Sequence, residues 1–136
     1  MKTRLMILAL VLTSVAAPAM AGPRDDILAT YAAAAKAADA GFAGFDAGRG
    51  KSLYDQQNTV SAESPSCASC HSASPLKQGK TRAGKAIDAM AVSATPDRFT
   101  DAEKVEKWFG RNCNTVLGRE CTTSEKGDFI TYLSGI

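Results

Sequence analysis

Apolar side chains recur every three or four residues in three stretches of the chain, a spacing that is typical of amphipathic helices. The first stretch, residues 24–40, is rich in alanine, and the residues that follow this spacing are Ile27, Leu28, Tyr31, Ala35 and Ala38. We therefore predict a helix in this stretch that ends near Gly41.

The other two stretches each follow a threonine that has a glutamate three residues after it, which is the spacing of a capping box. Thr100 and Glu103 predict a helix over residues 101–111, and Thr122 and Glu125 predict a C-terminal helix. The apolar residues of these two helices, available for a core or for a cofactor pocket, are Val105, Trp108, Phe109, Phe129, Ile130 and Leu133.

The segments between these helices are rich in residues that form turns. The glycine-rich residues 41–50 predict a connection, in which Gly50 either permits close helix approach or is a plain turn residue. Residues 51–54 predict a short helical turn. Residues 72–96 predict a long loop with a helical turn near 87–90, and a loop of that length needs something to pack on. Because no stretch alternates convincingly between apolar and polar residues, the predicted fold class is all-α.

The first residues of the chain have the pattern of a secretory signal peptide. Lys2 and Arg4 precede an apolar run at residues 5–12, and residues 19–21 have the small-x-small pattern of a cleavage site. The apolar run is too short to anchor the chain in a bilayer. We expect cleavage after Ala21 and export to the periplasm without stable membrane insertion.

Removal of residues 1–21 leaves one domain over residues 22–136. Cleavage removes two of the 16 basic residues, so the domain has 14 basic and 14 acidic residues. This balance gives no indication of nucleic-acid binding. All four cysteines lie in the remaining domain. In an oxidising compartment such cysteines are normally paired or bound to a metal or cofactor.

The strongest single motif is the sequence CASCH at residues 67–71. Its two thiols lie one helical turn apart, which matches the two vinyl groups of haem, and the imidazole that follows them can reach the iron. We therefore predict one covalent haem c, attached through Cys67 and Cys70, with His71 as an axial ligand of the iron.

Two other interpretations of these cysteines compete with haem. Cys67 and Cys70 could bind zinc together with Cys113 and Cys121, or form a thioredoxin-like redox pair. The redox pair lacks the surrounding strand–helix–strand pattern that it requires. A zinc site would leave the long loop of an all-helical exported chain unexplained.

The second axial ligand separates electron carriers from gas binders. His71 is the only histidine, and Met90 is the only one of four methionines that remains after signal cleavage. Met90 would make the chain a simple electron shuttle, although it follows His71 by only 19 residues. An apolar core contact is the commoner use of such a methionine.

Another candidate lies in residues 111–121, where Asn112 and Asn114 flank Cys113, and Cys121 follows eight residues later. The residues alone leave this candidate open. Asn112 is explained equally well as a helix C-cap, and the cysteines as a purely structural staple.

Four segments, CASCH, SATPDRFTD, EKWFGRNCN and GREC, closely resemble the oxygen-binding cytochromes c called sphaeroides haem protein. The order of segments along the chain also resembles the class I cytochrome c fold, in which the last helix crosses the first. The resemblance implies that Asn112 is the distal iron ligand, with Asn114 as the fallback, beside a disulfide between Cys113 and Cys121.

The asparagine of that family binds ferric iron and leaves it on reduction, so that the ferrous haem takes up a diatomic gas (O2, NO or CO). The resemblance also implies a dihaem cytochrome c as redox partner. The chemistry is reasonable, because an amide oxygen is a hard donor that suits iron(III) better than iron(II). A released amide can then donate its NH₂ group to a bound gas.

Three hypotheses for function follow. The first is an electron-accepting, gas-binding cytochrome with Asn112 as a labile ligand, the second is an electron shuttle with Met90, and the third is an oxygen or nitric oxide reductase or a peroxidase. A second histidine, the usual distal acid–base group, is lacking, and no acid is obvious in its place, so we assign no catalytic residue.

A few residues stay open between a functional and an ordinary structural role. Tyr31, Tyr54 and Tyr132 either bond a haem propionate or pack in the core. Four basic residues soon after the haem motif either form a solvated basic face, the commoner case, or steer an acidic redox partner. They are Lys77, Lys80, Arg82 and Lys85.

Overall fold

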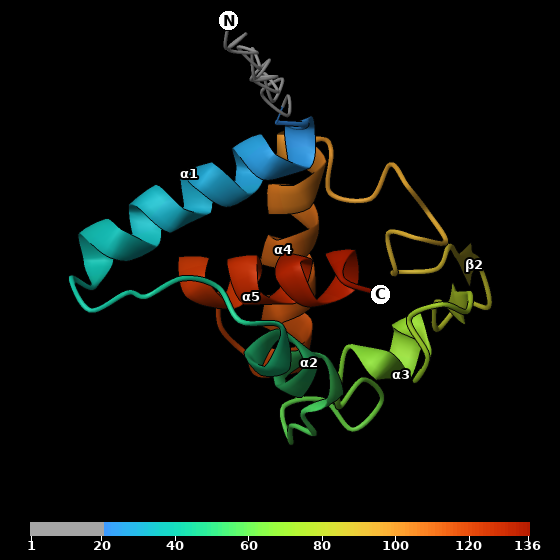
Figure 1. Ribbon diagram of the computed structural model, residues 1–136. Helices are drawn as coiled ribbons and strands as arrows, with labels where there is room; N and C mark the ends of the chain where they lie inside the picture. Colours follow the sequence, from blue (N-terminus) through green and yellow to red (C-terminus); the bar gives the residue numbers. More distant parts are fainter. Residues whose placement is uncertain (1–20) are drawn as a thin grey trace, which may run out of the picture.

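The structure is a computed structural model that describes residues 21–136 (Figure 1). The apolar run and basic residues of the predicted signal peptide lie outside this range. The described part is mostly helical, as predicted, with one very small sheet. Its elements are α1 (Pro23–Ala38), α2 (Ala47–Asp55), α3 (Ala68–His71), β1 (Gly79–Lys80), β2 (Ala86–Ile87), α4 (Ala102–Leu117) and α5 (Thr123–Ser134).

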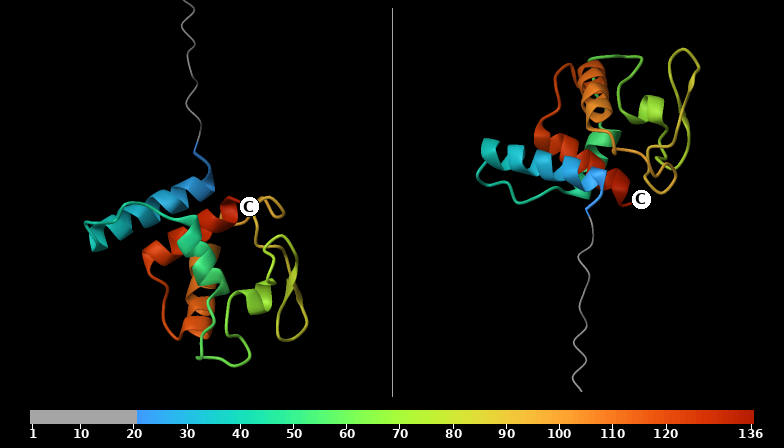
Figure 2. Two further views of the ribbon diagram at one scale, coloured as in Figure 1. Left: turned by 60° about the horizontal axis from the view of Figure 1, so that its bottom comes forward. Right: turned by 90° about the horizontal axis from the view of Figure 1, so that it is seen from above.

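Helix α1 confirms the first predicted helix. Pro23 occupies its first turn, where a missing N–H group costs nothing, and Asp25 and Asp26 complement the positive end of the helix dipole. Ile27, Tyr31 and Ala35 are buried on one face. α1 packs on α5, so the last helix crosses the first as expected (Figures 1 and 2).

Helix α2 is longer than the predicted turn at residues 51–54. It begins at Ala47 because the Asp46 carboxylate accepts a hydrogen bond of 2.7 Å from the Arg49 N–H and so caps the helix. Of the two roles considered for Gly50, close helix approach is confirmed. A Cβ atom at this position would overlap the Asp128 carbonyl oxygen of α5.

Helix α4 begins one residue later and ends six residues later than predicted. Its N-cap is Asp101 rather than Thr100, and the Asp101 carboxylate accepts a hydrogen bond of 3.0 Å from the Lys104 N–H. The helix ends where Gly118 adopts a left-handed conformation (φ 69°). Asn112 therefore lies inside α4, and the interpretation of Asn112 as a C-cap is wrong.

Helix α5 confirms the predicted capping box of Thr122 and Glu125. Its residues Ile130 and Leu133 are fully buried at the centre of the core. Phe129 packs against three aromatic rings from other parts of the chain, with centroid distances of 5.5–6.4 Å. These rings belong to Tyr54, Phe99 and Phe109.

Residues 72–96 form a loop, but not the one predicted. β1 and β2 pair as a short antiparallel hairpin, so the expectation of no strands is wrong here, and the helical turn predicted near residues 87–90 is not formed. The two-residue strands are too short to produce a recognisable apolar–polar alternation. No helix within residues 21–136 has the length and apolarity needed to cross a membrane.

Candidate haem site

The CASCH motif folds into the single helical turn of α3. The His71 N–H donates to the Cys67 carbonyl oxygen at 3.0 Å, which presents the two thiols and the imidazole from one turn. Neither Cys67 nor Cys70 is in a disulfide. Burial raises the pKa of the Cys67 thiol to about 11, so it is uncharged at neutral pH.

The His71 ring carries the clearest sign of a missing partner. Its Nδ1 atom is buried and has no hydrogen-bond partner within residues 21–136. Burial, with the nearby positive charge of Arg98, lowers the pKa of His71 to about 4, so the imidazole is neutral and able to coordinate a metal. A buried ring nitrogen without a protein partner and two unpaired thiols fit a covalently attached haem.

Tyr54 of α2 fixes the backbone beside His71. Its hydroxyl donates to the carbonyl oxygens of His71 and Ser72, at 3.0 and 2.7 Å. Its ring is fully buried against Phe129 and Tyr132. Tyr54 therefore supports α3 from the core, a role that its place in the sequence did not reveal.

Hydrogen bonds to backbone carbonyls organise the segment after the haem motif. The Arg98 guanidinium donates to the carbonyl oxygens of Asp88 and Ala89, at 2.6 and 3.0 Å. The Ala91 N–H donates to the Pro75 carbonyl at 2.9 Å. Met90 lies between these contacts, is buried, and belongs to the hydrophobic core.

Arg24 of α1 also forms hydrogen bonds with the end of this segment. Its guanidinium donates to the carbonyl oxygens of Pro96 and Arg98, at 2.7 to 3.0 Å. These contacts join residues more than 70 positions apart in the chain, so the arginines gave no local signal in the sequence.

Helix α4 carries the candidate distal residues. Asn112 is half-buried, whereas Asn114 is exposed and its amide donates to the Gly110 carbonyl at 2.7 Å. Trp108, one turn before Asn112, is 48% exposed, and Phe109 is buried in the aromatic cluster. Residues four apart lie on the same face of a helix, so Trp108 is a neighbour of Asn112.

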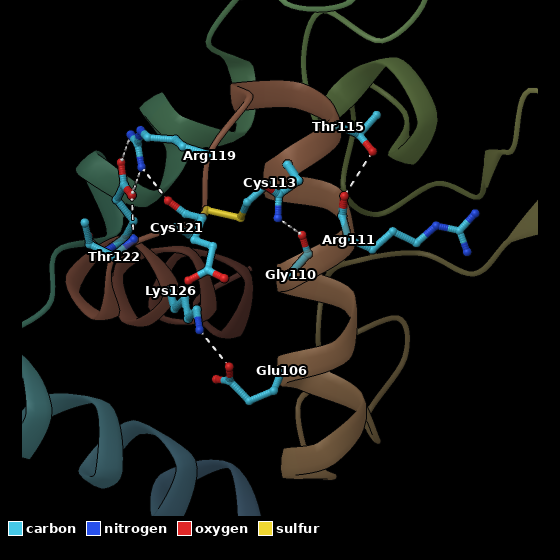
Figure 3. Close-up of a disulfide and its surroundings, with 12 residues drawn as sticks. Glu106, Gly110, Arg111, Cys113, Thr115, Arg119, Cys121, Thr122 and Lys126 are labelled. Carbon is cyan, nitrogen blue, oxygen red and sulfur yellow. Dashed lines mark hydrogen bonds and ion pairs between the residues drawn. A yellow bond between two sulfur atoms is a disulfide. The ribbon is translucent and has the colours of Figure 1, made fainter.

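A disulfide joins Cys113 of α4 to Cys121, which immediately precedes α5 (Figure 3). Arg119, in the connection, pairs with Glu125 through two hydrogen bonds of 2.7 and 2.8 Å. Since Cys113 and Cys121 are bonded to each other, the zinc site of four cysteines is not formed.

The other end of α4 is held by a polar cluster that the sequence did not reveal. The Tyr31 hydroxyl of α1 donates to the Glu106 carboxylate, and Lys126 Nζ of α5 lies 2.7 Å from the same carboxylate (Figure 3 shows the latter pair). The Lys126 ammonium also lies 5.6 Å from the centre of the Tyr31 ring. Asn112 thus lies between two positions at which α4 is held, Glu106 in this cluster and Cys113 in the disulfide.

Comparison with solved structures places the fold in a known class. Oxidised SHP, an oxygen-binding cytochrome c, is 46% identical, has a TM-score of 0.76, and covers 83% of this chain and 96% of its own. Oxidised cytochrome c'' from Methylophilus methylotrophus is 33% identical, has a TM-score of 0.72, and covers 82% of this chain and 92% of its own. With the helices and the CASCH turn, these matches define a c-type cytochrome.

Sequence comparison narrows the class. A family model described as a domain of unknown function, DUF1924, matches residues 40–133. The cytochrome c-type protein SHP of Cereibacter sphaeroides is 47% identical over 135 residues, which are 97% of this chain and 98% of the relative. Cytochrome c'' of M. methylotrophus is 42% identical over 86 residues, which are 62% of this chain and 60% of the relative. The chain therefore belongs to the family of the cytochrome c-type protein SHP.

Proposed function

We propose that this protein is a periplasmic, electron-accepting cytochrome that binds a diatomic gas in its ferrous state. One haem c is attached through Cys67 and Cys70, with His71 as the proximal and Asn112 as the distal ligand of the ferric iron. When bound, the haem supplies a redox-active iron whose distal position accepts O2, NO or CO. The relation to SHP, an oxygen-binding cytochrome c, supports this assignment.

The observation that carries the proposal is the setting of Asn112 in α4. Its side chain is half-buried and its neighbour Cys113 is bonded to Cys121, so the helix that carries the amide is fixed. The alternative, Asn114, is exposed and its amide is occupied by the Gly110 carbonyl. Asn112 therefore suits a ligand that leaves by side-chain rotation while its helix stays in place.

The surroundings of Met90 favour Asn112 over the electron-shuttle alternative. The N–H of Ala91, the residue after Met90, donates a hydrogen bond to the carbonyl oxygen of Pro75, four residues after His71. The carbonyl oxygen of Ala89, the residue before Met90, accepts a hydrogen bond from Arg98. Met90 is thus anchored to the segment that follows the proximal histidine. A residue from another element, such as Asn112 of α4, would therefore suit the second ligand position better than Met90.

The chemistry of the amide explains why reduction would open the site. The Asn112 oxygen is a neutral, hard donor, which binds iron(III) more firmly than iron(II). After rotation the same side chain can present its NH₂ group as a hydrogen-bond donor to a gas molecule. Burial lowers the pKa of His71, so its imidazole would be neutral and available as the proximal ligand.

Binding rather than turnover is the simpler function for this set of residues. The sequence contains no second histidine that could act as a distal proton donor. We therefore assign no catalytic residue. Residues 1–21 would act as the signal peptide, residues 22–136 as the cytochrome domain, and a dihaem cytochrome c as the electron donor.

The test uses absorption spectra of the ferric and dithionite-reduced holoprotein, with carbon monoxide and nitric oxide added to the reduced form. We expect a high-spin ferrous spectrum that changes promptly on adding either gas. Asn112→Ala should shift the ferric protein toward a high-spin spectrum and still allow gas binding.

Asn114→Ala and Met90→Leu are the matched controls, and both should keep the parent spectra. A low-spin ferrous spectrum that carbon monoxide does not change would mean that a strong ligand stays bound. If Met90→Leu then abolished this low-spin spectrum, and with it the weak red absorption band that a thioether ligand gives to ferric haem, the protein would be an electron shuttle.

A further inference from the structure

The charges of the predicted cytochrome domain are unevenly distributed. Residues 22–136 contain equal numbers of basic and acidic side chains, 14 of each. The hairpin segment, residues 76–88, contains four basic residues, namely Lys77, Lys80, Arg82 and Lys85, against one acidic residue, Asp88. A nearly neutral domain thus has one strongly positive projection.

The positive charge of the hairpin segment faces solvent. Lys77, Lys80 and Lys85 are exposed, and none of them forms an ion pair within residues 21–136. Arg82 pairs with Glu63 at 2.6 Å, but both side chains are more than 60% exposed. Of the ten basic residues elsewhere in the domain, five pair with a carboxylate, namely Arg49, Lys51, Lys104, Arg119 and Lys126.

The hairpin segment is fixed against the haem-binding turn. A Cβ atom at Gly79 would overlap the Cys70 carbonyl oxygen and lie 2.7 Å from the His71 Cα, so only glycine fits. The turn of the hairpin is closed by hydrogen bonds of Thr81 with Lys85, at 2.8 and 3.0 Å. The free ammonium groups are therefore held beside the segment that carries the proximal histidine.

A positive patch near a redox centre acts mainly on the rate of encounter. Complementary charge raises the association rate of proteins by about 10- to 1,000-fold at low ionic strength. The effect falls as salt screens the charges, because the Debye length is only about 10 Å at 0.1 M.

We propose that the hairpin segment is the docking surface for an acidic electron-donor protein, which it brings to the face of the molecule next to Cys70 and His71. This inference rests on the proposed function, because it requires that the protein accept electrons at its haem. It adds the site of docking and the sign of the partner's charge.

The test compares two variants of the holoprotein that lose the same charge. The hairpin variant carries Lys77→Gln, Lys80→Gln and Lys85→Gln. The matched control carries three lysine-to-glutamine changes on the helices, at Lys36, Lys51 and Lys104, all of which are exposed. Rates of haem reduction are measured by flash photolysis with FMN semiquinone, whose phosphate is anionic, and with neutral lumiflavin semiquinone.

We expect the hairpin variant to be reduced by FMN about three- to tenfold more slowly than the parent at low ionic strength. Its rate with lumiflavin should be unchanged, because no charge is involved in that encounter. Reduced flavodoxin, an acidic protein, should show a larger loss than FMN. The control variant should lose less than half as much with either anionic donor, and 0.5 M salt should remove the differences.

Equal loss in the two variants would overturn the proposal, since it would mean that only net charge matters. A similar loss with lumiflavin would also overturn it, because the change would then lie in the haem site itself. Spectra and carbon monoxide binding of the same variants test the proposed function separately. If these are as proposed while the rates do not respond, the docking surface alone is wrong.

Discussion

The helical region of the molecule, formed by α1, α2, α4 and α5, differs from residues 56–100 in how it is held together. In the helical region, apolar side chains interlock, and the ion pairs Arg49–Asp128 and Glu106–Lys126 join one helix to another. Residues 56–100 are held chiefly by hydrogen bonds of their backbone groups. These groups bond to one another and to the side chains of Arg24, Arg98 and Tyr54. Residues 56–100 have few buried apolar side chains of their own.

The comparison indicates what each region contributes. The helical region can form most of its core from the polypeptide alone, and it holds α4 in place. Residues 56–100 contain Cys67 and Cys70, the cysteines proposed to bind haem, and need a packing partner, which a covalent haem would provide. Folding stability should therefore depend on the haem far more in residues 56–100 than in the four helices.

Loss of haem attachment should have the largest effect. In Cys67→Ser with Cys70→Ser, we expect the protein mass to fall by that of one haem group. Amide hydrogen exchange should then become fast throughout residues 56–100, while α1 and α5 keep part of their protection. Mass spectrometry measures both quantities.

The matched control for this experiment removes the other two cysteines. Cys113→Ser with Cys121→Ser should keep the haem and lower the free energy of unfolding by about 2.5 kcal/mol, the loop-closure value for this disulfide. Retained protection of residues 56–100 in the haem-free variant would contradict the comparison between the two regions.

A change at the crossing of α2 and α5 should have the next largest effect, on the helical region. Gly50→Ala would place a Cβ atom on the Asp128 carbonyl and 2.8 Å from the Tyr132 Cβ, so the helices must separate. We expect a loss of about 3 kcal/mol in the free energy of unfolding, measured with denaturant.

Gly110→Ala in α4 is the control for the helix crossing. A Cβ atom there meets nothing within 4 Å, so helix propensity should raise the free energy of unfolding by about 0.5 to 1 kcal/mol. Equal effects of the two alanine substitutions would mean that the helices do not approach each other as closely as described.

The smallest expected effect concerns the polar cluster that fixes the start of α4. Hydrogen bonds from Lys126 and Tyr31, acting against partial burial, lower the pKa of Glu106. A carboxyl group with a lowered pKa stabilises the fold above its unfolded pKa of about 4.5, and this stabilisation is lost as the pH falls through the folded value.

Glu106→Gln should therefore reduce stability at pH 7 by no more than about 1 kcal/mol, and the difference from the parent should vanish near pH 3. Urea denaturation between pH 3 and 7 measures this difference. Asp97→Asn, at an exposed carboxyl group of the connecting loop, is the control and should show little change. A difference that persisted at pH 3 would mean that Glu106 acts through packing rather than charge.

Local sequence determined the parts of the fold that depend on neighbouring residues. Apolar spacing and alanine content predicted α1, the capping box of Thr122 and Glu125 predicted α5, and the spacing of Cys67, Cys70 and His71 indicated covalent haem. Four short segments indicated the family. For α4 the start was predicted to within one residue, but its end was not, because the left-handed conformation of Gly118 was not recognised.

Contacts between distant residues were decided only in the tertiary structure. Gly79 against Cys70, Tyr54 against the His71 carbonyl, and the Tyr31–Glu106 pair of α1 and α4 join segments that local patterns treat independently. The sequence thus predicted the haem-binding motif and determined most helix starts, because these follow from residues within one or two turns. The tertiary structure decided how α4 and the hairpin are held around the site, because that requires the packing of the whole chain.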